Sequence, residues 1–104
     1  MKITLEEANR IAKGALAEAV ARNIKINVAV CDVGGRLVAF QRMDDAMWAG
    51  AYGSQGKAVA SASFGVPSGN LAERAEHPTF RAIREHEGNH MIFGQGAVPI
   101  LRSG

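Results

Sequence analysis

Three histidines and a single cysteine are the side chains whose type and spacing can support metal or nucleophilic chemistry. His86, Glu87 and His90 match the pattern H-E-x-x-H, which in zinc proteases places two imidazoles on one helix face and the carboxylate beside a bound water. Gly88 and Asn89, inside the pattern, are poor helix formers, and the apolar residues that follow favour a strand. The context therefore disfavours a catalytic zinc site and favours a polar loop whose two accessible histidines bind a metal ion only weakly.

An isolated lysine and a charged strand end form the second candidate site. Lys57 is the only charged residue in the stretch 46–72. An ammonium in such surroundings either extends from an apolar surface or is placed to meet an anion. Arg42 ends a predicted strand and Asp44 and Asp45 follow it, and these charges are then expected to line the mouth of a pocket that faces Lys57. The alternative left open is a structural ion pair between Lys57 and either Asp32 or Asp44.

The sulfur-containing side chains admit a functional and a structural interpretation. Cys31 lies next to Asp32, but a nucleophilic thiol needs a base that lowers its pKa, and the sequence names none. We therefore expect Cys31 to act as a small buried hydrophobe. Met43, together with Met47 and Met91, can form the apolar floor of a site for a flat ligand, although methionine more often fills gaps in a core.

The first element that positions these residues is a helix. Thr4 and Glu7 form a capping box, in which the hydroxyl accepts a hydrogen bond from the third helical amide and the carboxylate accepts one from the capping amide. Apolar residues then recur at helical spacing from Leu5 to Val20. Asn23 is the expected end of the helix.

A hairpin follows this helix. Apolar and other residues alternate over 26–31 and again over 37–42, which is typical of two strands. Between them lies the sequence D-V-G-G, whose glycines tolerate the positive φ of a tight turn. We expect the hairpin to pack one face against the first helix.

The remaining chain predicts more helix and then a second hairpin. Residues 46–63 show helical spacing despite three glycines, which are tolerated where a helix packs closely on another backbone. Pro67 and Ser68 open a short helix, and one or two further turns follow the proline at 78. Residues 91–93 and 98–100 favour strands that a glycine-containing turn connects, although the proline at 99 limits the last strand to an edge or a bulge. The order α-β-β-α-α-β-β predicts an α+β fold with an antiparallel sheet and helices on its faces.

Composition narrows the function classes. With 104 residues the chain is expected to form one domain. The sequence has 12 Lys plus Arg and 10 Asp plus Glu, which give a net charge of +2. This charge is too small to indicate binding of nucleic acid, and the sequence contains no basic cluster. One cysteine excludes an internal disulfide and fits a reducing compartment. The N-terminus lacks the apolar core of a signal peptide and no segment is apolar enough to span a membrane, so we expect a cytoplasmic protein.

Five blocks together resemble a known family. They are T-L-E-E-A at 4–8, V-A-V-C-D-V-G-G-R-L-V-A-F-Q-R-M-D at 28–44, Q-G-K-A at 55–58, F-G-V-P-S at 64–68 and G-Q-G-A-V-P-I at 94–100. In this order they resemble the GlcG/HbpS-like haem-binding family, which also includes the C-terminal domain of the PduO cobalamin adenosyltransferase. The similarity covers almost the whole chain, and the blocks are specific in combination rather than singly.

The resemblance implies a profilin-like fold, homo-oligomers and, in some members, binding of haem or corrinoid-related molecules. The favoured function is therefore binding of a small molecule, either haem or a related tetrapyrrole. The ligand-binding candidates are Arg42, Met43, Asp44 and Lys57. No family motif assigns an iron ligand, so the metal candidates rest only on the use of imidazole as an axial donor, and they are His77, His86 and His90.

Two alternatives stay open at this point. The chain can be an enzyme or accessory factor of a small-molecule catabolic pathway, in which Arg42, Asp44 and Lys57 bind an anionic substrate or move protons. It can also be a structural oligomer with no working pocket.

Family members usually continue into another strand and a final helix, whereas this sequence stops at residue 104. We therefore expect an unpaired sheet edge and exposed apolar surface, covered in a homo-oligomer.

Overall fold

The first helix, α1 (Leu5–Ala21), begins at the predicted capping box. The computed structural model describes residues 2–101. In it, Thr4 Oγ1 accepts a hydrogen bond from the Glu7 amide at 3.0 Å, and Glu7 Oε1 accepts one from the Thr4 amide at 2.9 Å. Asn23, just past the helix, has a φ of +55°, and this left-handed residue turns the chain towards the sheet. The predicted helix and its end are confirmed.

The predicted hairpin is also confirmed. Strands β1 (Asn27–Cys31) and β2 (Leu37–Arg42) pair antiparallel. The Asp32 carboxylate closes the turn between them, because its Oδ1 accepts from the amides of Gly34 and Arg36, each at 2.9 Å. These two contacts fix the conformation of the turn and the direction in which the second strand leaves it.

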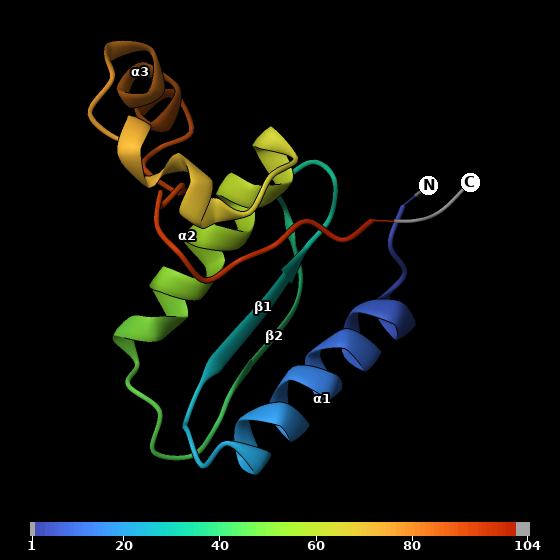
Figure 1. The fold of residues 1–104 in the computed structure, drawn as a ribbon. Helices are drawn as coiled ribbons and strands as arrows, with labels where there is room; N and C mark the ends of the chain where they lie inside the picture. Colours follow the sequence, from blue (N-terminus) through green and yellow to red (C-terminus); the bar gives the residue numbers. More distant parts are fainter. Residues whose placement is uncertain (1, 102–104) are drawn as a thin grey trace.

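Two helices cover opposite faces of the hairpin (Figure 1). α1 lies against both strands, whereas α2 (Ala49–Phe64) lies against β1. Ala8 of α1 packs in one buried cluster with Val30, while Cys31 packs against a second cluster that contains Val59 of α2. Successive side chains of a strand point to opposite faces, so the two clusters lie on the two sides of the sheet. The predicted contact of the hairpin with the first helix is therefore confirmed.

An arm of two short helices extends beyond this three-layered body (Figure 1). It consists of η1 (Ser68–Arg74), a 3-10 helix, and α3 (Pro78–His86), and it confirms the short helices that the sequence predicts. Three aromatic rings attach the arm to the body. The Phe80 ring stacks on Phe64 with 5.1 Å between centroids and meets Phe93 edge-on at 5.7 Å.

The prediction of a second hairpin is wrong. Among the described residues, β1 and β2 are the only strands, and 91–93 and 98–100 are extended without pairing. Met91 and Phe93 are nonetheless buried in the core, so part of this apolar segment does face inward. A strand also needs a neighbour for its hydrogen-bond ladder, and the described chain offers none there. The observed fold is α+β, with a two-stranded sheet and helices α1, α2, η1 and α3.

Within residues 2–101, every helix is too short or too polar to cross a lipid bilayer.

Candidate functional site

A cleft of about 880 Å³ lies between the hairpin turn, the middle of α2 and the turn that follows α3. This volume falls within the roughly 300–1,000 Å³ typical of small-molecule sites. The end of β1 and the start of β2 form one side, residues 52–59 of α2 form the base, and residues 86–92 form the other side. Three segments distant in sequence therefore meet at this cleft.

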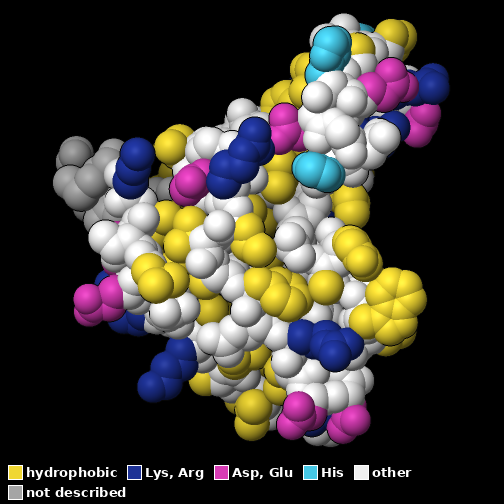
Figure 2. Space-filling model, turned by 180° about the vertical axis from the view of Figure 1, so that it is seen from behind, with side chains coloured by type: hydrophobic (Ala, Val, Ile, Leu, Met, Phe, Trp, Pro, Cys, Tyr) yellow, Lys and Arg dark blue, Asp and Glu magenta, His cyan; other side chains and the backbone are white. Residues whose placement is uncertain are grey.

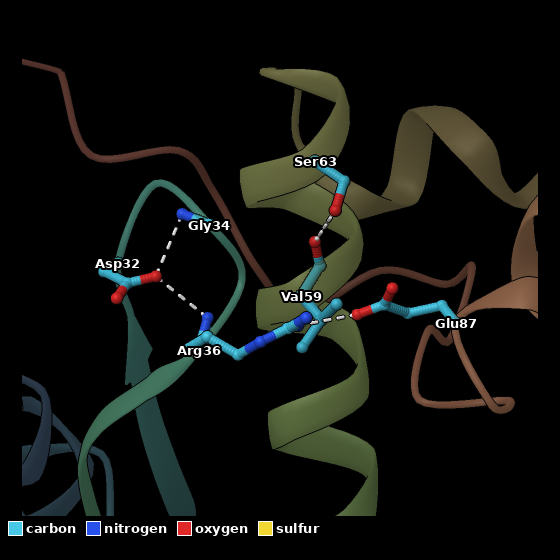
Figure 3. Close-up of polar contacts among 6 residues, drawn as sticks. All are labelled: Asp32, Gly34, Arg36, Val59, Ser63 and Glu87. Carbon is cyan, nitrogen blue, oxygen red and sulfur yellow. Dashed lines mark hydrogen bonds and ion pairs between the residues drawn. The ribbon is translucent and has the colours of Figure 1, made fainter.

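An ion pair bridges two sides of the cleft. Arg36 leaves the hairpin turn and extends past Val59 to Glu87 (Figure 3), with 2.7 Å between Nη1 and Oε1. The hydrogen bond and the negative charge of Glu87 raise the pKa of Arg36, so the guanidinium stays charged. Because Arg36 is exposed to solvent, this pair can exchange partners readily when another anion enters.

The base of the cleft is formed by one face of α2. Tyr52, Gln55, Gly56 and Val59 line it, and their spacing of three and four residues places them on the same side of the helix. Gly56 allows the returning chain to lie directly on α2, since a Cβ there would be 2.6 Å from Ile92 Cγ1. The Ile92 amide also donates to the Gly56 carbonyl oxygen at 3.0 Å. The absence of a side chain at one helical position thus sets where residues 86–92 run.

The H-E-x-x-H segment is a turn, as the sequence predicts. α3 ends at His86, and Gly88 and Asn89 have φ values of +69° and +61°, which no helix permits. His86 and His90 are consequently not one turn apart on a helix, but both line the cleft. Among the described residues, no group of three His, Cys, Asp or Glu side chains is arranged to hold a metal ion.

The third histidine lies outside the cleft. His77 precedes α3 and caps it, because its Nδ1 accepts a hydrogen bond from the Thr79 amide at 3.2 Å. Its ring also meets Phe80 edge-on, with 6.1 Å between centroids. All three histidines thus belong to the arm and its following turn, where histidine side chains appear on the projecting part of the surface (Figure 2).

Cys31 lines the cleft as a half-buried thiol. Burial raises its pKa, and the neighbouring Asp32 carboxylate raises it further. The thiol is therefore protonated at neutral pH and is a poor nucleophile. This arrangement agrees with the apolar packing role that the sequence suggests.

The charged candidates at the strand end lie apart from the cleft. Arg42 is exposed at the end of β2, and Met43 holds that end to the start of β1. The Met43 amide donates to the Ile26 carbonyl oxygen at 3.1 Å, and its Sδ accepts from the Ile26 amide at 3.3 Å. Asp44 follows in an exposed turn. Neither the cleft nor a second cavity, which residues 26–33 of the hairpin line together with parts of α1 and α2, is lined by Arg42, Met43 or Asp44.

Lys57 lies on α2 beside the segment that contains Gly94 and Gly96. A Cβ at Gly96 would be 3.1 Å from Lys57 Cδ, so the aliphatic stem of the lysine packs on glycine backbone. Within the described chain, Lys57 makes no ion pair with Asp32 or Asp44, so the structural alternative does not form. Participation of Arg42, Met43, Asp44 and Lys57 in ligand binding stays a prediction. For Lys57, the variant Lys57→Met with haemin affinity as the readout tests this prediction.

Sequence reasoning missed several cleft residues, above all Arg36, and it singled out Glu87 only within the H-E-x-x-H pattern and not as the partner of Arg36. The D-V-G-G turn does signal that Arg36 emerges at the tip of the hairpin. Nothing in the local sequence signals that residue 87 reaches that tip, or that Tyr52 and Leu37 border the same hollow.

Comparison with known proteins identifies the family. The family model described as haem degrading protein HbpS-like matches residues 3–104. The chain belongs to the HbpS-like family. The resemblance read from the sequence blocks is thereby confirmed. None of the curated proteins matches this HbpS-like chain.

Solved structures share the fold of this HbpS-like chain. Protein ORFY of Klebsiella pneumoniae superposes with a TM-score of 0.86 at 22% identity, over 98% of this chain and 71% of that one. A double mutant of HbpS from Streptomyces reticuli gives a TM-score of 0.83 at 26% identity, over 100% and 68%. A further HbpS structure gives 0.82 at 25% identity, over 98% and 70%. Each of these chains therefore contains polypeptide outside the match.

Proposed function

We propose that this HbpS-like protein binds haem in the cleft between the hairpin turn, α2 and residues 86–92. The proposal rests on one observation above all: two imidazoles, those of His86 and His90, border a hollow of ligand size with a largely apolar lining. The family description, which refers to haem degradation, supports the choice of ligand.

The donor set of the cleft fits haem. Imidazole is a common axial donor to haem iron, and either histidine is accessible enough to supply it. Leu37, Val59 and Ile92 offer apolar surface for the faces of a flat macrocycle. When bound, haem would supply redox and oxygen chemistry at its iron. The protein residues hold the macrocycle, exclude water from one face and supply the donor nitrogen.

Arg36 is the cation placed to bind the haem carboxylates. It already holds one carboxylate, that of Glu87, at the rim of the cleft. A haem propionate is the same kind of anion and competes for the same guanidinium. Haem binding therefore requires a propionate to replace Glu87 on Arg36. Glu87 opposes this exchange because its negative charge repels the propionate and because its hydrogen bond occupies the guanidinium.

Haemin titration followed by Soret absorbance tests the proposal. His86→Ala and His90→Ala are compared with His77→Ala, a matched control whose imidazole lies outside the cleft. We expect one of the two cleft variants to lose the wild-type Soret position and at least about tenfold in affinity, the scale seen when a metal site is perturbed. The control should bind as the wild type does. No Soret shift with stoichiometric haemin, or unchanged spectra and affinities in both cleft variants, would overturn the proposal.

A further inference from the structure

An aromatic pair, Trp48 and Tyr52, continues the base of the cleft towards the start of α2. Tyr52 lines the cleft, and the Trp48 ring meets the Tyr52 ring at 86° with 6.1 Å between centroids. Trp48 has helical backbone angles and lies four residues before Tyr52, so both side chains are on the same side of the helix. The aromatic pair therefore extends the apolar base of the cleft by one helical turn.

Both rings of the aromatic pair are largely uncovered. Trp48 is 68% and Tyr52 is 69% exposed, whereas tryptophan in folded proteins is on average highly buried. Among the described residues, the ring contacts of each are only with the other. Exposed apolar surface that adjoins a cleft is typical of a ligand-binding groove. The aromatic pair thus offers surface to a ligand that lies in the cleft.

The opposite end of the cleft holds a cation. Arg36 extends past Val59 to reach Glu87 (Figure 3). A Cβ at Gly35 would lie 3.4 Å from Val59 Cγ1, so the hairpin turn is level with Val59 on α2. A helix rises about 1.5 Å per residue, which places Tyr52 about 10 Å from Val59 along the axis. The cleft therefore has the Arg36 guanidinium at one end and the aromatic pair at the other.

We propose that the aromatic pair binds the apolar edge of a flat tetrapyrrole whose carboxylates are held by Arg36, an inference that rests on the proposed haem site. The two propionates of haem lie on one edge of the macrocycle, and the opposite edge carries vinyl and methyl groups. With a propionate on Arg36, this apolar edge points along α2 towards Tyr52 and Trp48. Aromatic rings bind such an edge by apolar contact and by offset or edge-to-face stacking.

This arrangement selects the class of ligand. A small aliphatic anion would reach Arg36 and leave the aromatic pair uncovered. A porphyrin with carboxylates around its whole perimeter would place a charge against the aromatic pair, and burial of an unpaired charge is costly. Arg36 is the only Lys or Arg among the described residues that line the cleft, so no second guanidinium or ammonium compensates that charge. The selected ligand is a tetrapyrrole with carboxylates on one edge only.

Titration with two iron-free porphyrins tests the proposal. Protoporphyrin IX carries propionates on one edge, and coproporphyrin III carries further propionates in place of the vinyl groups. We expect protoporphyrin IX to bind with 1:1 stoichiometry and coproporphyrin III to bind at least about tenfold more weakly. Trp48 is the only tryptophan of the chain, so its indole N–H gives a single NMR resonance. Protoporphyrin IX stacked beside the indole should shift this resonance through its ring current.

Substitutions of the two rings provide the matched comparison, with porphyrin fluorescence as the measure of affinity. Tyr52→Ala and Trp48→Ala are expected to weaken protoporphyrin IX binding roughly three- to tenfold, because each removes an aromatic contact. Tyr52→Phe and Trp48→Phe keep a ring and should bind within about twofold of the wild type. Val20→Ala, an equally exposed apolar position of α1 outside the cleft, is the control. If an alanine variant fails to fold, the wild-type comparison of the two porphyrins still decides.

Three outcomes would overturn the proposal. The first is that protoporphyrin IX does not bind or leaves the Trp48 resonance unshifted. The second is that coproporphyrin III binds as tightly as protoporphyrin IX. The third is that both alanine variants bind as the wild type does; a smaller assembly of Trp48→Ala in light scattering would then assign the aromatic pair to contact with a second copy.

The haem proposal fails separately from this one. It depends on His86 and His90 and on the Soret band of haemin, whereas the iron-free porphyrins need no iron donor. Histidine-dependent haemin binding without any effect of Tyr52→Ala or Trp48→Ala would remove the aromatic subsite and leave the haem site. Ring-dependent binding of protoporphyrin IX without a Soret shift of haemin would do the reverse.

Discussion

Replacement of Gly56 by alanine tests how closely residues 86–92 lie on α2, and so tests the geometry of the cleft itself. The new Cβ would meet three atoms of Ile92: Cγ1 at 2.6 Å, Cδ1 at 2.7 Å and Cβ at 3.0 Å. A rotamer change cannot clear the contact with the Ile92 Cβ, whose position follows the backbone. That backbone is itself held by the hydrogen bond from the Ile92 amide to the Gly56 carbonyl oxygen.

The expected change in stability of Gly56→Ala follows from two opposing effects. Alanine is favoured over glycine inside a helix by about 1 kcal/mol. Overpacking of a well-packed contact costs about 1–3 kcal/mol. Gly53, also in α2, supplies the control, because a Cβ there meets nothing within 4 Å. Gly53→Ala should therefore raise stability by up to about 1 kcal/mol, and Gly56→Ala should lie about 1–3 kcal/mol below it.

Thermal unfolding followed by circular dichroism measures this difference. For a domain of this size 1 kcal/mol corresponds to about 4–8 °C in Tm, so Gly56→Ala should melt at least about 4 °C below Gly53→Ala. The variant should also bind haemin more weakly, because a shifted Ile92 moves the side of the cleft. Equal melting temperatures for the two variants would refute the reasoning and would place residues 86–92 elsewhere.

Three further expectations concern the ion pair, the thiol and the first helix. Glu87→Gln should raise haemin affinity roughly two- to fivefold because it releases Arg36, and Arg36→Gln should lower haemin affinity by a similar factor. A lower haemin affinity for Glu87→Gln would instead indicate that the ion pair holds residues 86–92 in position. Burial raises the pKa of Cys31 in the folded state, so its contribution to stability is present below the pKa of a free thiol and is lost as pH rises through the higher folded value. The free energy of unfolding, measured with urea near pH 8 and near pH 10, should therefore fall less between the two pH values for Cys31→Ser than for the wild type. Thr4→Ala removes the cap of α1 and should cost about 0.5–2 kcal/mol in the same unfolding assay, and no change would show that α1 does not need its cap.

Local signals carried the parts of the fold that could be predicted. The capping box needs only Thr4 and Glu7, three residues apart, and the hairpin turn needs only the hydrogen bonds that Asp32 makes within four residues. The turn at 86–90 was likewise predictable, because Gly88 and Asn89 oppose a helix wherever the segment lies.

Non-local contacts account for what sequence reasoning missed or placed wrongly. Arg36 and Glu87 are 51 positions apart, and their meeting depends on where α3 ends relative to the hairpin. The apolar residues at 98 and 100 are compatible with a strand, yet a strand exists only where a second backbone pairs with it. The β-propensity of a segment depends on its own residues and carries no information about whether another strand lies beside it.

The amino-acid sequence by itself determined the helices, the first hairpin and the family to which the chain belongs, because each of these depends on patterns within a few residues or on blocks in a fixed order. Only the tertiary structure decided which histidines share a cleft and which arginine lines it with them. The physical reason is that a side chain's chemistry depends on its neighbours in space, and packing of α2 on β1 and of Ile92 on Gly56 selects those neighbours.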